Sequence, residues 1–475
     1  MPRQSAGAWA GILSWRDSMR GKICSGVITL LVLGVVALSE ARVNSLTGGV
    51  DVGLDIDRRT NRGAASGQSN DYNTVFTTPS FSFTSSDIKD GINFRYAPSF
   101  RYDLNGKGTN VDQNLNLSVQ RLLTKVWQIR ISELYVNADD SSLTSTPPST
   151  ANNPQTPTNT TTDQISNELG RRRFSTNNAS LTSDYTYLQD SVVSLGYTYS
   201  LLRNDGAGTL GFQDYDKHSG LLSVSYRFNP EWKTTVGGQY VRGLYETQST
   251  PTLGAQSDLS EYHGDMSLES FVFSKNILSL SYGYVGTRYD DPTRKDSDIH
   301  NTTVGWKREI SPHLNADIGA GPSYVKTDGQ DATWGYNAHA NVNYMIEHGR
   351  FGIGVAKTYS QDNFTGTSTG GTIDSWTAKG DFNYQLYEKL STGVFASYAD
   401  QNRQNAVVGT SHSTISYKEK VSSTGINMNY SFWRWYTLSI GYTFSRQEAE
   451  STLVNSFDDN RVYMTIGAQK ELFRW

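Results

Sequence analysis

The alternation of apolar and polar residues between Trp334 and Tyr359 limits the folds open to this chain more than any other feature. The apolar positions of the first run are Trp334, Tyr336, Ala338, Ala340, Val342, Tyr344 and Ile346, and the positions between them hold Gly335, Asn337, His339, Asn341 and Asn343. The alternation resumes after residues 347–349 with Phe351, Ile353, Val355 and Tyr359. A period of two predicts a strand with one apolar face, and three turn-forming residues between two such runs predict a hairpin. Each run is long enough to cross a bilayer, since a tilted strand needs about 9–11 residues.

Similar runs recur from Leu46 to the end of the chain. We count about 20 candidate strands (range about 18–22), which predicts an all-β, antiparallel, up-and-down transmembrane barrel. The connections alternate between turns of about two to five residues and mostly longer, polar loops, as in barrels of the outer membrane. Pro79 and Pro98 interrupt the second and third runs, so we expect weak or bulged pairing there.

Composition favours a membrane barrel over a soluble chain. Only 36% of the residues are hydrophobic and the mean hydropathy is −0.52, which is low for a chain that must fill large soluble cores. Disorder is the other usual reason for low hydrophobicity, but 12% aromatic residues argue against it. A barrel reconciles these values, because only alternate residues need to be apolar.

The first 41 residues have the pattern of a secretory signal. Arg20 and Lys22 precede an apolar run, Val27–Leu38, and Ser39-Glu40-Ala41 predicts cleavage after Ala41. Residues 1–18 lack this pattern, so two translation starts are open, Met1 and Met19. The barrel would then comprise residues 42–475.

Cleavage would remove Cys24, the only cysteine, which excludes disulfides, thiolate metal sites and covalent c-type haem. We expect no cofactor. The remaining chain has a net charge of about −6, which argues against nucleic acid as a partner, and we expect none.

The longest interruption of the strand pattern covers residues 137–173. It is rich in Ser, Thr, Asn and Pro and ends in Arg171, Arg172 and Arg173. Such a composition predicts a loop on the external side, and two interpretations are open. Either the loop is exposed outside, or it folds inward as a constriction with the three arginines at its base. The first strand begins almost at the cleavage site, so we expect no N-terminal plug domain.

Aromatic residues gather near both ends of the predicted strands, as in the two girdles of membrane barrels. The chain ends in Phe473 and Trp475. Over about residues 44–475 it resembles the Gram-negative outer-membrane β-barrel, porin-like proteins. In that family the final aromatic strand is the assembly signal, so the resemblance implies an outer-membrane location, with lipid and the barrel-assembly machinery as partners. Phe473 and Trp475 have the opposite parity to Met464 and Ile466, which implies a bulge near residues 471–472 or a shortened signal.

The polar parity predicts which charged residues line the lumen. The candidates are Arg95, Arg101, Arg130, Arg227, Lys233, Asp112, Glu261, Asp265, Glu269, Asp317, Asp381 and His339. Two interpretations are open. Opposite walls of unlike sign would create a transverse field that orients polar solutes, or the charges are simply solvated in a wide lumen.

The function that these features favour is a porin-like channel for passive passage of polar solutes. Two alternatives stay open: a barrel that exports an exopolysaccharide, with Tyr289, Phe395 and Tyr463 as lumen aromatics, and a barrel sheath around a multihaem cytochrome. We expect no enzyme, because the GxSxG-like residues 366–370 lie in a loop and the seven histidines have no metal-binding spacing. No metal site is predicted. Asp296 with Asp298, and residues 458–460, have Ca²⁺-like spacing that hydrated surface carboxylates usually explain.

Overall fold

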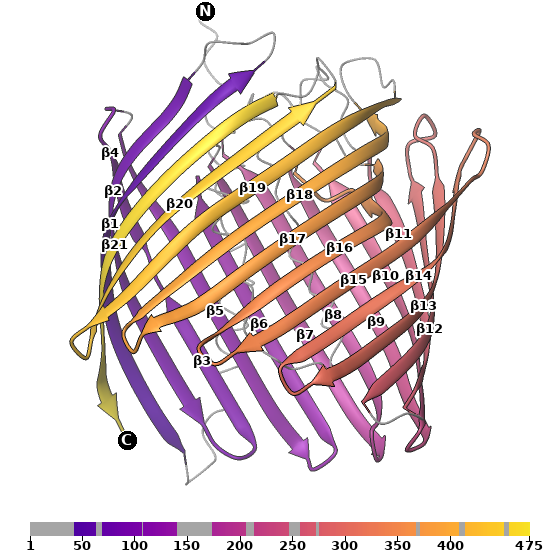
Figure 1. Cartoon of the computed structure of the whole chain (residues 1–475), viewed down its shortest axis with the longest axis horizontal. Helices are drawn as coiled ribbons and strands as arrows, with labels where there is room; N and C mark the ends of the chain where they lie inside the picture. Colours follow the sequence, from indigo (N-terminus) through magenta and orange to yellow (C-terminus); the bar gives the residue numbers. More distant parts are fainter. Residues whose placement is uncertain are drawn as a thin grey trace, which may run out of the picture.

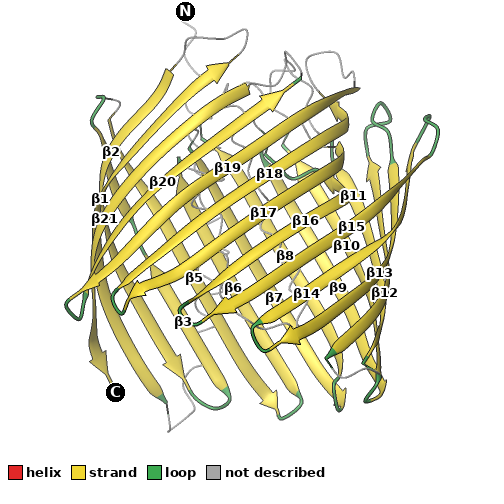
Figure 2. Ribbon diagram, in the orientation of Figure 1, coloured by secondary structure: helices red, strands yellow, loops and turns green. Residues whose placement is uncertain are grey.

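The computed structural model describes residues 42–62, 69–106, 108–139, 173–205, 213–246, 257–271, 275–366, 371–407, 414–450 and 456–475. Every regular element in these ranges is a β-strand (Figures 1 and 2). Among the same residues, no helix is long and apolar enough to cross a membrane.

The strands follow one another along the chain with short turns and longer loops between them. Their bounds are β1 Val43–Arg62, β2 Ser69–Ser86, β3 Asp90–Tyr96, β4 Ser99–Asp103, β5 Gly108–Thr124, β6 Trp127–Ala138, β7 Phe174–Leu188, β8 Ser191–Asn204, β9 Tyr215–Asn229, β10 Trp232–Tyr245, β11 Leu259–Ser270, β12 Asn276–Tyr289, β13 Ser297–Ser311, β14 Leu314–Thr327, β15 Thr333–Ile346, β16 Gly349–Asp362, β17 Gly371–Tyr387, β18 Leu390–Val407, β19 Thr414–Phe432, β20 Tyr436–Ala449 and β21 Ser456–Arg474.

The sheet closes on itself, because β1 pairs antiparallel with both β2 and β21. β3 and β4 each pair with β2 and β5, so they are two halves of one wall strand. The 21 strands therefore occupy twenty positions in the ring, and the predicted antiparallel barrel is confirmed. The hairpin at Trp334–Tyr359 is β15–β16, the fourteenth and fifteenth position. In Figure 1 the C-terminus and the short turns lie at the lower end, which is the periplasmic end of an outer-membrane barrel.

The two prolines share one interruption of the wall. β2 pairs with β3 from Phe81 onward and with β4 up to Thr77, so Pro79 faces the break that contains Pro98. Neither proline can donate a backbone hydrogen bond, and placing them opposite each other confines the loss to one point. The hydroxyl of Thr78 donates to Ser99 Oγ across the break, at 2.8 Å. The predicted weak pairing is confirmed.

One face of the ring is apolar around its circumference. Val50 and Val52 on β1 lie opposite Ala468 and Ile466 on β21, and the register carries this parity from strand to strand. Many large apolar side chains on this face are exposed in the isolated chain. Such a surface belongs against lipid, where closed strands also leave no backbone group unpaired.

The last strand contains the expected bulge. Leu46 lies opposite Phe473, but Thr47 lies opposite Glu471, so Leu472 is the extra residue. The bulge turns Phe473 and Trp475 to the apolar face, where the Trp475 ring lies 6.3 Å from that of Phe83. The inferred bulge near residues 471–472 is therefore confirmed, and the role of these two residues in assembly stays a prediction.

Candidate functional site

The extracellular end of the β16–β17 hairpin leaves the wall and enters the barrel. Pairing between β15 and β16 stops where Ala338 lies opposite Lys357, whereas β16 and β17 stay paired as far as Asp362 and Gly371. Beyond that point the Asn301 side-chain amide on β13 donates to the Tyr359 carbonyl, at 3.4 Å. We call residues 358–366 the inserted tip. Because its contacts reach strands that are not its neighbours in the ring, the tip lies inside.

Distance explains why the whole tip bends. A circular ring of twenty strands with a spacing of about 4.8 Å and a tilt of about 40° has a diameter of about 40 Å. β16 and β10 are then about 30 Å apart. The five residues Asp362–Gly366 span at most about 17 Å when extended. The loop alone cannot reach β10, so the strand ends must turn inward with it.

Asn363 is the polar anchor of the inserted tip. The hydroxyl of Tyr245 donates to its backbone carbonyl at 2.6 Å, and the hydroxyl of Tyr289 donates to its Oδ1 at 2.9 Å. Its Nδ2 donates to Glu261 Oε1 at 2.7 Å. Asn363 is only 2% exposed, so these three bonds replace water completely. A fourth bond, from Gln213 N to the Gly366 carbonyl at 3.0 Å, holds the far side of the tip.

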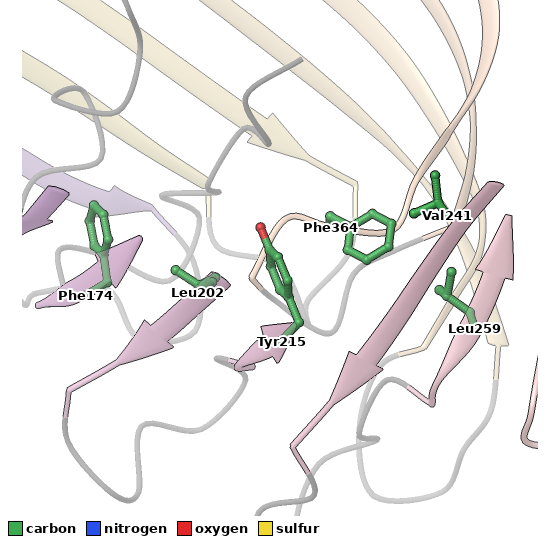
Figure 3. Packing of buried hydrophobic residues seen from close by; sticks show 6 residues of the cluster. All are labelled: Phe174, Leu202, Tyr215, Val241, Leu259 and Phe364. Carbon is green, nitrogen blue, oxygen red and sulfur yellow. The ribbon is translucent and has the colours of Figure 1, made fainter. Parts of the chain in front are cut away.

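Phe364 is the apolar anchor. Its ring meets that of Tyr215 edge-on at 5.4 Å and stacks on that of Tyr245 at 6.0 Å. The ammonium of Lys217 lies 4.5 Å above the ring. Gly243 makes room for it, since a Cβ there would lie 2.7 Å from the ring. Figure 3 shows Phe364 among side chains from β9, β10 and β11, strands that are far from it in the sequence.

The seat of Phe364 belongs to a wider band of inward, buried apolar residues near the extracellular end, which we call the apolar collar. Its members are Val136, Ala138, Phe174, Leu202, Tyr215, Val241, Leu259, Ile299 and Val325. They stand on the parity that is polar elsewhere in each strand, as the register of neighbouring strands shows. Sequence reasoning missed the collar and the tip. The available signal was apolar residues on the polar parity only at the strand ends next to the long loops.

The register places all twelve predicted lumen residues on the inward face, but several neutralise one another within the wall. Arg101 bonds to Asp55 at 3.2 Å and to Asp112 at 3.3 Å, and all three are buried. The remaining ion pairs are Arg130 with Asp184, Arg227 with Asp190 at 2.8 Å and Asp381 with Arg350 at 2.8 Å. Asp317 and Glu261 each lie within hydrogen-bond distance of a histidine, His339 at 3.2 Å and His263 at 3.1 Å. Lys233 lies opposite Glu269 in the β10–β11 register, and Asp265 lies opposite Gly237, four residues further along β10. Arg95 is exposed. Short-range pairing weakens any field across the lumen.

The predicted constriction loop can be followed only at its edges. Arg171 and Arg172 lie outside the described residues, as does most of 137–173. Arg173 is held at the wall, with ion pairs to Asp112 at 3.6 Å and to Asp205 at 3.5 Å. Within the described part of the chain, it is the inserted tip that narrows the mouth.

Inward aromatic rings below the mouth lie flat on the wall. Phe395 covers Gly425 of the neighbouring strand, and Tyr463 covers Gly441, each too closely for any side chain at the glycine. Tyr289, the third lumen aromatic named from the sequence, bonds to Asn363. Phe395 and Tyr463 therefore lie against the wall on one side, and Phe395 is 38% exposed.

A repeated cluster fixes the extracellular ends of two hairpins on the outer face. In each copy a Tyr bonds to a His, the second Tyr bonds to an Asp, and an Arg bonds to the same Asp, all at 2.6–2.8 Å. The copies are Tyr197, Tyr199, Arg203, Asp216 and His218 on β8–β9, and Tyr282, Tyr284, Arg288, Asp298 and His300 on β12–β13. Asp298 is thus engaged by Tyr and Arg. In the described residues no group of three or more His, Cys, Asp and Glu side chains would hold a metal ion.

The polar inner face, the apolar outer face and the closed ring together decide the class of the protein. The chain is an outer-membrane β-barrel protein. No family model matches it, and no curated protein is similar to it. Similar solved structures include Pseudomonas aeruginosa OpdQ (TM-score 0.43, 11% identity, 90% of this chain and 98% of that chain), the siderophore receptor PirA from the same organism (0.49, 9%, 90% and 80%) and Pseudomonas aeruginosa OccK2 (0.42, 10%, 90% and 98%). At these identities the likeness concerns the fold.

Cysteine labelling on β15 tests the assignment of faces in the barrel. Cysteines at His339, Asn341 and Asn343 should react with a water-soluble maleimide, whereas cysteines at Ala338 and Ala340 should stay protected by lipid. Asn337 also points inward but is 8% exposed, because its amide bonds to Thr302, Pro322 and Ser323 where Pro322 interrupts the β13–β14 ladder. A cysteine there should react slowly, although strict alternation along the strand would predict a reactive inward position. Equal reactivity along the strand would contradict the assignment.

Proposed function

We propose that this barrel is a passive channel for polar solutes across the outer membrane, narrowed at its extracellular mouth by the inserted tip. The observation that carries this proposal is the polar inner face along the membrane-spanning length of the wall. On β8, for example, the inward positions are Ser194, Gly196, Thr198 and Ser200. Hydroxyl and amide groups on such a wall exchange hydrogen bonds with water and passing solutes at little net cost.

The charge arrangement supports weak ion preference. Several predicted lumen charges, including Arg130 and Arg227, form an ion pair within the wall, as Arg101 does with Asp55 and Asp112. A paired charge attracts a passing ion far less than a free one, since the two fields cancel beyond a few ångströms. The channel should therefore sort solutes by width at the mouth more than by charge.

No specific observation favours the two alternatives. A polysaccharide exporter would present a row of aromatic rings for a sugar polymer to slide along, whereas of the three inward aromatics named above Tyr289 is bonded to Asn363 at the mouth and Phe395 and Tyr463 lie on separate strands. A cytochrome sheath would need a haem-bearing partner, and no feature of the described inner face indicates a binding site for one.

Planar-bilayer recording of the purified protein tests the channel. We expect stepwise currents with a potassium-to-chloride permeability ratio close to unity. The same recording on a Phe364→Ala variant separates a channel closed at the mouth from a barrel that does not conduct. Absence of current steps in both proteins would contradict the proposed function.

A further inference from the structure

The inward turn of the tip leaves a wedge in the barrel wall. Thr333–Asn337 on β15 pair with β14 on one side but have no partner strand on the other. Thr358–Asp362 on β16 pair only with β17. We call the space between these two five-residue edges the wedge. Both edges belong to described residues, and the wedge is the one place where consecutive strands of the ring part over such a length there.

The wedge begins near the outer membrane surface. Nine residue pairs, from Ile346 opposite Gly349 to Ala338 opposite Lys357, separate it from the periplasmic turn. About 9–11 tilted residues cross the hydrocarbon layer, so the paired part of β15–β16 spans the membrane and the unpaired part starts at the outer interface. Unpaired backbone groups are tolerated at this level, because water reaches them there and does not reach them in the hydrocarbon.

The two sides of the wedge differ in chemistry. On the outer face of the β15 edge, Trp334 is 72% exposed and Tyr336 is 51% exposed. The outer side of the wedge is thus aromatic and belongs to the lipid-facing surface.

Polar groups line the inner side of the wedge. Asn337 bonds there to the Ser323 hydroxyl at 3.1 Å, and Asn301 bonds to the same hydroxyl at 2.7 Å. A molecule that crosses from lipid to lumen at this point would meet aromatic rings first and amide and hydroxyl groups second.

Among the described residues, side chains seal the wedge. The Tyr359 ring from β16 lies against Gly335, in the space that a side chain at 335 would fill. Outside it, the rings of Tyr336 and Trp376 meet edge-on at 6.2 Å, across β16. Side-chain contacts of this kind reopen far more readily than a hydrogen-bonded ladder, because aromatic rings change rotamer without breaking backbone bonds.

We propose that the wedge is a lateral portal through which single-chain amphiphiles, such as medium-chain fatty acids, pass between the outer leaflet and the barrel interior. The acyl chain follows Trp334 and Tyr336, and the polar head follows Asn301 and Thr358, which are inward and less buried than Asn337. This route goes beyond the axial passage of polar solutes and does not depend on it.

The register also defines a closed form. If β15 and β16 continued to pair as they do below, Thr333 would lie opposite Asp362 and Gly335 opposite Ser360. The edges Thr333–Asn337 and Thr358–Asp362 thus match in length and alignment. A Gly335→Cys/Ser360→Cys pair would lock this closed form when combined with Phe364→Ala, which frees the tip from its seat. An Asn341→Cys/Gly354→Cys pair, opposite each other in the existing ladder, is the matched control with the same Phe364→Ala change.

Photolabelling in vesicles tests the portal. A dodecanoic acid bearing a diazirine at its chain end is added to the protein in phospholipid vesicles and irradiated, and labelled peptides are mapped by mass spectrometry. We expect label on the outward Trp334 and Tyr336 and also on the inward Asn301 and Thr358. Tyr359→Ala should raise the inward label severalfold. Label confined to the outward residues would overturn the portal and leave only a lipid-filled groove.

The locked variant decides the route by which label arrives. Oxidation of the 335/360 pair should abolish the inward label, and oxidation of the 341/354 pair should leave it unchanged. Inward label that persists in the locked protein would show entry through the mouth and overturn the proposal. Ion current through the barrel is a separate measurement, so failure of the portal and failure of the proposed channel give different results.

Discussion

Replacing Phe364 with alanine is expected to raise the single-channel conductance severalfold. The ring is buried between Tyr215 and Tyr245, and truncating a buried Phe removes about 3–5 kcal/mol of packing and transfer free energy. The hydrogen bonds of the inserted tip, mainly those of Asn363 and the one from Gln213 to Gly366, contribute about 1 kcal/mol each and are left to hold it without the ring. Docking of the tip should therefore become a minor state, and the mouth should widen. Single-channel recording measures the change directly.

The double variant Asn363→Ala/Phe364→Ala should widen the mouth further, because it removes both anchors. Phe351→Ala is the matched control, since Phe351 lies on the lipid face near the periplasmic turn, far from the mouth. Its conductance should equal that of the unmodified protein. If Phe364→Ala and Phe351→Ala have the same conductance, the tip does not limit flow.

Arg101→Ala should lower the free energy of unfolding by about 3–5 kcal/mol, whereas Arg95→Ala should change it little. Arg101 is 8% exposed and lies between the buried carboxylates of Asp55 and Asp112. Without it, Asp112 keeps only the longer contact to Arg173, and like charges face each other in a space that water does not reach. Arg461 still bonds to Asp55 at 2.8 Å, which favours the lower end of the range.

Urea titration of the barrel in phospholipid vesicles, followed by tryptophan fluorescence, measures this difference. Arg95 is the matched control, because it is also inward and lies on the other half of the same wall strand, but it is exposed. Equal unfolding midpoints for the two variants would contradict a structural role for Arg101. Arg101→Lys should recover only part of the loss, since a lysine cannot bond to both carboxylates in the fork geometry of a guanidinium.

The contrast between Arg95 and Arg101 marks how far the sequence predicts the site. Alternation along one strand places both side chains on the inner face, because successive residues of a strand point to opposite sides. Whether an inward charge is free or paired depends on the strands beside it. Asp55 lies 46 residues before Arg101, and nothing in the local pattern connects them.

The sequence by itself determined the strands, their number, their antiparallel order and the lipid-facing side of each, down to the bulge that turns Phe473 and Trp475 outward. These features follow from local alternation and from short turns, which join strands that are neighbours in both sequence and space. The position of the inserted tip was decided only in three dimensions. Its seat is built from β9 to β12, and Asn363 meets Glu261 across 102 residues of sequence. The local sequence of a loop does not indicate which wall strands it will contact, because those strands come close to it only when the ring closes.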